Sequence, residues 1–131
     1  MKVAIIEDEE ILHKVLTEKF KSEGYEVALA EDGEKALGVI ETEKPDMIVL
    51  DIILPKKDGF EVLKEIKSNP SIKMIPVIVL SNLGRGEEIK RAMDLGAVDY
   101  LIKTQHPLHE VITKVNDYLK NSKYGKIEKS S

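Results

Sequence analysis

Four charged residues in this sequence stand directly after short apolar runs, where folding could bring them together for chemistry. Glu7 and Asp8 follow VAII, Asp51 follows MIVL, and Lys103 follows VDYLI. Carboxylates held close together repel one another and raise each other's pKa unless a cation lies between them. Mg²⁺ is a hard ion that suits a site with a few carboxylates and several retained waters. A free carboxylate beside such an ion can attack a phosphorus atom and form an acyl phosphate.

An amine and a hydroxyl would supply the rest of this chemistry. The ammonium of Lys103 would neutralise negative charge on the phosphoryl oxygens, and Ser81, directly after PVIVL, would donate a hydrogen bond to another oxygen. Asp51 is therefore the predicted nucleophile. Glu9 and Glu10 extend the acidic run EDEE and suit the first turn of a helix, where acids interact favourably with the helix dipole.

Short apolar runs alternate with helical patterns along the chain, which is typical of βα units and a parallel sheet. Three runs are continuously apolar, as expected for central strands, and two admit polar residues and suit the edges. The pattern favours an α/β fold with a doubly wound five-stranded parallel sheet in the order 2-1-3-4-5 and helices on both faces, as in flavodoxin. The predicted strands cover residues 3–6, 25–30, 47–50, 76–80 and 98–102.

Apolar residues at helical spacing predict helices between and after these strands. Asp32 and Asp58 are predicted N-caps, and Gly24 and Gly96 are predicted to supply left-handed positions just past helix ends. The predicted apolar stripe of the first helix consists of Ile11, Leu12, Val15, Leu16 and Phe20. Surface positions are predicted for the three histidines, His13, His106 and His109. Core or near-core positions are predicted for Met47, Met74 and Met93.

The chain of 131 residues is predicted to form one domain over residues 1–120, followed by a polar tail over residues 121–131. Its formal net charge of −4 argues against a nucleic-acid-binding surface, which is normally basic. The chain contains no cysteine, which excludes disulfides and thiolate metal sites. No run is apolar and long enough for a signal peptide or a membrane span, so we expect no membrane partner and a cytoplasmic location.

These features together resemble the receiver domain of two-component response regulators over residues 1–120. The resemblance is carried by the acidic pair in IIEDEE, the segment IVLDIILPKKDG, the hydroxyl in VIVLSN, and the aromatic residue and lysine in DYLIK. It implies that Asp51 accepts phosphate from a phosphohistidine and that Ser81 and Lys103 contact the phosphoryl oxygens. It also implies that the cofactor is Mg²⁺, bound by Glu7, Asp8, Asp51 and the backbone carbonyl of Ile53.

The same resemblance implies the partners and the output. A sensor histidine kinase or a histidine phosphotransfer protein would donate the phosphoryl group. Ser81 and Tyr100 would then move together as a switch, although Tyr100 by its position on an edge strand suits simple packing equally well. The face of residues 84–120 would bind a downstream effector or a second copy of the chain. The chain would catalyse only its own phosphorylation and slow dephosphorylation. Whether it is a stand-alone receiver or the front part of a larger regulator stays open.

Three positions depart from the commonest pattern of that family. Glu7 stands where the first acid is usually aspartate, and Asn82 replaces a small residue after the hydroxyl. Thr104 follows Lys103 where the family usually has proline, often after a cis bond. A cis bond before a residue other than proline would cost about 2.5–4 kcal/mol. We therefore expect either a trans Lys103–Thr104 bond in a rearranged loop or a strained cis bond.

Three other functions are compatible with parts of the pattern. A receiver fold could serve as a docking module that acts independently of phosphorylation. The presence of all the candidate site residues, Glu7, Asp8, Asp51 and Lys103, argues against this function. An aspartate-nucleophile phosphatase needs a second carboxylate two residues after the nucleophile, and that residue is Ile53. A nucleotide- or flavin-binding module needs a phosphate-cradling loop after the first strand, where EDEE would repel phosphate. The docking module is the main alternative.

Overall fold

Five parallel strands form one sheet in the order β2-β1-β3-β4-β5, which confirms the predicted fold class. The computed structural model describes the backbone of residues 1–130 and the side chains of residues 1–120. The strands are β1 (Lys2–Ile6), β2 (Glu26–Ala30), β3 (Met47–Leu50), β4 (Val77–Ser81) and β5 (Asp99–Ile102). Each lies within two residues of its predicted bounds. The helices are α1 (Glu10–Ser22), α2 (Gly33–Glu43), α3 (Gly59–Ser68), α4 (Gly86–Asp94) and α5 (Leu108–Ser130).

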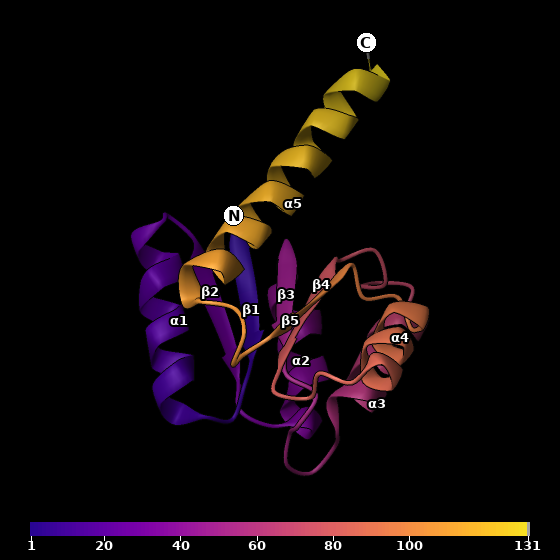
Figure 1. The fold of residues 1–131 in the computed structure, drawn as a ribbon. Coiled ribbons are helices and arrows are strands. Elements are labelled where there is room, and N and C mark those ends of the chain that lie inside the picture. Colours follow the sequence, from indigo (N-terminus) through magenta and orange to yellow (C-terminus); the bar gives the residue numbers. More distant parts are fainter. Residues whose placement is uncertain (131) are drawn as a thin grey trace.

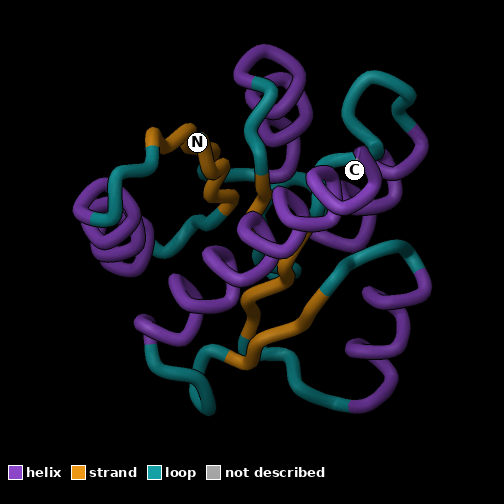
Figure 2. The backbone as a smooth tube through the Cα atoms, turned by 90° about the horizontal axis from the view of Figure 1, so that it is seen from above, coloured by secondary structure: helices purple, strands orange, loops and turns teal. Residues whose placement is uncertain are grey.

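The helices cover both faces of the sheet, as Figure 1 and the view from above in Figure 2 show. Side chains alternate between the two faces along a strand. In β1, Val3 and Ile5 pack in the cluster that includes residues of α1 and α5, whereas Ala4 and Ile6 pack in the cluster with residues of α2, α3 and α4. The sheet is therefore the middle of three layers, and its central strands are buried from both sides.

The central strands are more deeply buried than the edge strands, as the sequence predicts. All residues of β3 and β4 are buried, and so are all residues of β1 after its first. The edge strands β2 and β5 contain exposed or partly exposed residues. Full burial of an aliphatic side chain stabilises the fold by about 1.5–3 kcal/mol. The central strands are thus rigid supports, and residues that follow them are held firmly at the carboxyl edge of the sheet.

Helix caps occur where the sequence predicts them. The Asp32 carboxylate accepts a hydrogen bond from the backbone N–H of Lys35 at 2.9 Å, and Asp58 accepts one from Glu61 at 3.0 Å. Gly24 and Gly96 have φ values of 90° and 111°, which side chains other than glycine rarely adopt. These four predictions are confirmed. The first helix differs, because its N-cap residue makes no side-chain capping bond.

The buried face of α1 includes Leu16 and Phe20 from the predicted stripe, but not Ile11. His13, Leu16 and Phe20 are buried, whereas Ile11 is 81% exposed. Residues three and seven positions apart share one helix face, but Ile11 lies two positions before His13 and so points elsewhere. The prediction of a surface position for His13 is therefore wrong.

Two methionines also differ from their predicted core or near-core positions. Met74, in the loop between α3 and β4, is 85% exposed. Met93 is 42% exposed on α4, a helix whose only buried residue is Ala92. Met47 is fully buried in β3, as predicted. Apolar character alone does not distinguish the buried methionine from the two exposed ones, because burial depends on whether another helix or strand covers the side chain.

The backbone of α5 continues as a helix to Ser130, through residues predicted as a polar tail. The side chains of residues 121–130 and all of residue 131 lie outside the described part of the chain. The domain boundary at residue 120 thus stays a prediction. Among the described residues, no helix combines the length and the apolar character needed to cross a bilayer.

The start of α2 packs closely against the loop after β3. Gly33 N–H donates to the carbonyl of Pro55 at 3.2 Å, and a Cβ atom at Gly33 would lie only 1.9 Å from the carbonyl oxygen of Lys57. A Cβ at Gly38, in the same helix, would meet nothing within 4 Å. The two glycines therefore form a matched pair for a test of this contact.

We predict that Gly33→Ala lowers the free energy of unfolding by about 1–3 kcal/mol, because the methyl group forces the loop and the helix apart. Gly38→Ala should instead raise it by about 0.5–1 kcal/mol, because alanine is the better helix former. Urea denaturation followed by circular dichroism measures both changes. Shifts in the same direction for both variants would contradict the close approach.

Candidate functional site

The carboxyl ends of β1 and β3 bring three acids together. Glu7 and Asp8 follow β1, and Asp51 follows β3; each offers a carboxylate oxygen within 4.8 Å of those of the other two. The strands are neighbours in register, with Ile6 opposite Leu50, and Asp51 N–H donates to the carbonyl of Ile6 at 3.0 Å. Glu7 and Asp51 are buried, whereas Asp8 is exposed. The predicted acidic cluster is therefore present.

The ammonium of Lys103 reaches this cluster from β5, two strands away from β3. Its Nζ lies 2.7 Å from Asp51 Oδ2 and 2.8 Å from Glu7 Oε1. The backbone N–H of Lys103 donates to the carbonyl of Ser81 at 2.9 Å, which fixes the start of the side chain at the end of the sheet. The long lysine side chain spans the width of β4. The structure thus pairs the predicted nucleophile with the predicted amine.

Burial and charge set the protonation of these groups. The pKa of Glu7 is raised to about 7, mainly by burial and also by the charge of Asp51, although contacts with Lys103 and the backbone N–H of Glu9 lower it in part. Burial lowers the pKa of Lys103, but its hydrogen bonds to Asp51 and Glu7 outweigh that effect and hold the pKa above its ordinary value. The lysine is therefore a permanent cation beside the acids.

Ser81 and Tyr100 meet at the backbone of residue 83. Leu83 N–H donates to the Ser81 hydroxyl at 3.4 Å, and the Tyr100 hydroxyl donates to the Leu83 carbonyl at 2.5 Å. Both side chains are buried, and burial raises the pKa of Tyr100. The two residues predicted to switch are thus connected through the backbone of one residue of the β4–α4 loop, Leu83.

The loop after β3 keeps Ile53 next to the predicted nucleophile. Ile53 N–H donates to Asp51 Oδ1 at 3.1 Å, and its side chain is 52% exposed. Gly59 N–H donates to the carbonyl of Ile52 at 2.7 Å, and a Cβ at Gly59 would lie 2.3 Å from the Asp51 carbonyl oxygen. Only glycine fits there, so the start of α3 presses directly on the backbone of Asp51.

The Lys103–Thr104 peptide bond is trans, which decides between the two predicted conformations. The chain then turns tightly, because the N–H groups of Gln105 and His106 both donate to the carbonyl of Ile102. Pro107 follows and leads into α5. The loop without proline after Lys103 is therefore ordered by backbone hydrogen bonds of its own.

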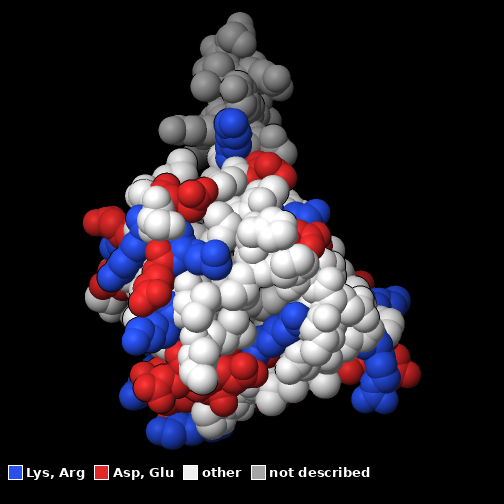
Figure 3. Space-filling view, turned by 60° about the vertical axis from the view of Figure 1, so that its left-hand side comes forward, with Lys and Arg blue, Asp and Glu red and all other residues white. Residues whose placement is uncertain are grey.

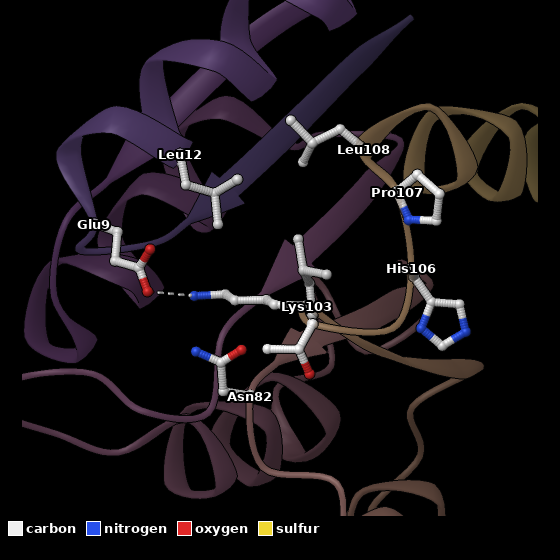
Figure 4. A pocket seen from close by; sticks show the side chains of 9 residues that line it. Glu9, Leu12, Asn82, Lys103, His106, Pro107 and Leu108 are labelled. Carbon is white, nitrogen blue, oxygen red and sulfur yellow. Dashed lines mark hydrogen bonds and ion pairs between the residues drawn. The ribbon is translucent and has the colours of Figure 1, made fainter.

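Glu9 is a site residue that the sequence reading missed. The sequence predicts for it only a favourable interaction with the helix dipole, yet its Oε1 lies 3.2 Å from Lys103 Nζ. Acidic side chains gather at the lower end of the face in Figure 3, and the close view in Figure 4 shows the Glu9 carboxylate directed at Lys103. Its position next to two strand-end acids was the available signal.

The donor set fits a hard divalent ion. Carboxylate oxygens from three residues converge, and one of them, Glu7, is buried with a raised pKa in spite of the nearby ammonium. A divalent cation would remove the repulsion that one lysine only partly offsets. No histidine belongs to this cluster, so oxygen-preferring ions suit it better than zinc.

Residues 3–116 match the family profile described as the response regulator receiver domain. The chain belongs to this family. This receiver domain is 40% identical over 123 residues to the alkaline phosphatase synthesis transcriptional regulatory protein PhoP of Bacillus subtilis (strain 168), a match that covers 92% of the chain and 49% of PhoP. The chain spans less than half the length of this and other curated relatives.

Solved structures agree with the family and the fold. The phosphorylated cyanobacterial phytochrome response regulator RcpA is 33% identical, with a TM-score of 0.74 over 89% of each chain. The Mn²⁺-bound form of response regulator Rcp1 is 29% identical, with a TM-score of 0.79 over 90% of this receiver domain and 93% of Rcp1. The receiver fold is thus shared with these proteins.

We predict that Glu7→Gln stabilises the receiver domain in metal-free buffer at pH 8 by about 1–3 kcal/mol. Because the pKa of Glu7 is raised from 4.5 to about 7, the folded state loses stability as the pH rises through this interval, and a neutral amide avoids that loss. Urea denaturation in EDTA at pH 8 and pH 5 measures the effect. The difference from wild type should largely disappear at pH 5; a destabilised variant at pH 8 would contradict it.

Proposed function

We propose that this receiver domain is a phosphoacceptor whose nucleophile is Asp51. The observation that carries the proposal is the pairing of the buried Asp51 carboxylate with Lys103 at 2.7 Å inside a cluster of acids. An exposed aspartate would be a solvated surface group, whereas this one is held in place by a cation. Membership of the response regulator family supports the same role.

The cofactor that suits the site is Mg²⁺, with Glu7, Asp8, Asp51 and the backbone carbonyl of Ile53 as its ligands. When bound, it would neutralise charge on the phosphoryl oxygens. The solved Mn²⁺-bound form of Rcp1 supports a divalent ion in this fold. The proposal also explains why the sequence keeps three carboxylates close together at an energetic cost.

The donor would be a phosphohistidine of a sensor histidine kinase or a histidine phosphotransfer protein. One oxygen of Asp51 forms a bond to phosphorus while the P–N bond breaks, and the imidazole takes up a proton and leaves as neutral histidine. Lys103 has three N–H donors, and one of them would donate a hydrogen bond to a phosphoryl oxygen in place of a carboxylate. The hydroxyl of Ser81 would turn from the Leu83 backbone and donate to another oxygen.

Movement of Ser81 would then reach Tyr100 through the backbone of Leu83, because both side chains hydrogen-bond to that residue. The face of residues 84–120, which includes α4 and β5, would change shape and bind an effector or a second copy of the chain. In this proposal the domain catalyses only its own phosphorylation and slow dephosphorylation. Its cytoplasmic location stays an expectation.

We predict that Asp51→Asn abolishes covalent phosphorylation by acetyl phosphate in Mg²⁺ buffer, because the amide cannot act as the nucleophile. Intact-protein mass spectrometry would show the mass of one phosphoryl group added to wild type and none added to the variant. Asp58→Asn is the matched control, since Asp58 lies in the same loop and caps α3. Phosphorylation of Asp51→Asn at the wild-type level would refute the assignment.

We further predict that Tyr100→Phe separates phosphorylation from its output. Loss of the hydroxyl removes the hydrogen bond to Leu83 and lowers the free energy of unfolding by about 1 kcal/mol. The rate of Asp51 phosphorylation should stay near that of wild type, while the amide NMR shifts that phosphorylation causes in residues 84–120 become smaller. Wild-type shifts in the variant would show that Tyr100 only packs.

A further inference from the structure

The carboxylate of Glu9 is the third acid on the ammonium of Lys103. Its distance to Nζ is 3.2 Å, compared with 2.7 Å for Asp51 and 2.8 Å for Glu7. The Glu9 side chain is 55% exposed, whereas those of the other two acids are almost fully buried. Glu9 is therefore the outermost of the three acids and the one that solvent and incoming molecules reach first.

The Glu9 side chain is not needed to start α1. Glu9 occupies the N-cap position, yet it makes no side-chain capping bond. Its backbone N–H instead donates to Glu7 Oε2 at 3.0 Å, which fixes the backbone at the edge of the site. The backbone of Glu9 is therefore fixed, and its carboxylate makes no capping bond. The carboxylate contacts Lys103 instead.

A cavity of about 380 Å³ opens beside this pair, lined by Glu9, Leu12, Asn82, Lys103, Pro107 and Leu108 among others. In Figure 4 the Glu9 carboxylate faces the end of the Lys103 side chain, and the Asn82 amide lies nearby. A donor that approaches the lysine from this cavity therefore meets the charge of Glu9, which lines the cavity together with Lys103.

We propose that Glu9 determines which phosphodonors the site accepts. This inference rests on the proposed phosphoacceptor function. Glu9 accepts a hydrogen bond from Lys103 and so occupies one of the three N–H groups with which the lysine could bind a phosphoryl oxygen. Its negative charge also repels strongly anionic phosphodonors near the entrance. The site thereby disfavours small dianionic acyl phosphates relative to donors of lower charge, such as phosphoramidates, which share the P–N bond of phosphohistidine. Glu9 is a positioning and selectivity residue, and it does not react itself.

Both small donors complete the same reaction at Asp51. With acetyl phosphate, a carboxylate oxygen of Asp51 bonds to phosphorus, the P–O bond to the acetyl group breaks, and acetate leaves with the electron pair. With phosphoramidate, the P–N bond breaks, and nitrogen takes up a proton and leaves as ammonia. Because the product is identical, a difference between the two rates reports on the approach of the donor.

The test compares Glu9→Gln with wild type, using acetyl phosphate and phosphoramidate at saturating Mg²⁺ and pH 7. We expect the second-order rate constant with acetyl phosphate to rise about three- to ten-fold at low ionic strength, and that gain to shrink in high salt. The rate with phosphoramidate should rise by a smaller factor, so the ratio of the two rates increases. A purely structural role would change both rates by one factor.

Glu10→Gln is the matched control, because Glu10 is the next acid, is exposed and stands in the first turn of α1. It removes the same formal charge and should change the ratio much less. Glu9→Asp retains the charge but withdraws it from the ammonium, and we expect an intermediate ratio. Thermal unfolding followed by circular dichroism confirms that each variant is folded; if Glu9→Gln is not, the Glu9→Asp ratio decides.

An unchanged ratio in Glu9→Gln, or an equal change in Glu10→Gln, would overturn the selectivity role while phosphorylation of Asp51 itself still stood. Failure of wild type to accept phosphate from either donor would instead overturn the proposed phosphoacceptor function. The two failures are therefore distinguishable in the same set of measurements.

Discussion

The contact between the Lys103 ammonium and buried carboxylates is the interaction on which the rest of the site depends. Asp51 and Glu7 are almost fully buried and close to each other, and like charges in such a place destabilise the fold. One lysine, held at 2.7 and 2.8 Å, offsets part of that cost. The remainder leaves the pocket with excess negative charge, which favours cation binding and prepares the site for a phosphoryl group.

The sheet makes this arrangement possible because it delivers the charges from separate strands to one edge. β1, β3 and β4 are buried on both faces, so their ends are held in register. The loop after β3 is fixed in turn by α2 and α3, where Gly33 and Gly59 allow backbone contacts too close for any side chain. Rigid strands and tight loops together set the distances between groups that lie far apart in the sequence.

Much of the fold could be predicted because its signals are local. Continuous apolar runs indicated the central strands, and Asp32 and Asp58 were identifiable as caps from their place before a helical pattern. Predictions failed where burial depended on a partner element. His13 is buried although histidine is polar, and Ile11 and Met74 are exposed although both are apolar, because the rotation of α1 and the path of a loop are set by packing.

The sequence by itself determined the types and the order of the site residues, and hence that three acids, a hydroxyl and a lysine would lie at one edge of a parallel sheet. Only the tertiary structure decided how they pair. It connected Ser81 to Tyr100 through Leu83, and it placed Glu9 on Lys103 when a role in the helix dipole was the expected one. The reason is physical: alternation and capping act between neighbours in sequence, whereas a charge pair depends on distances that exist only after the strands have packed.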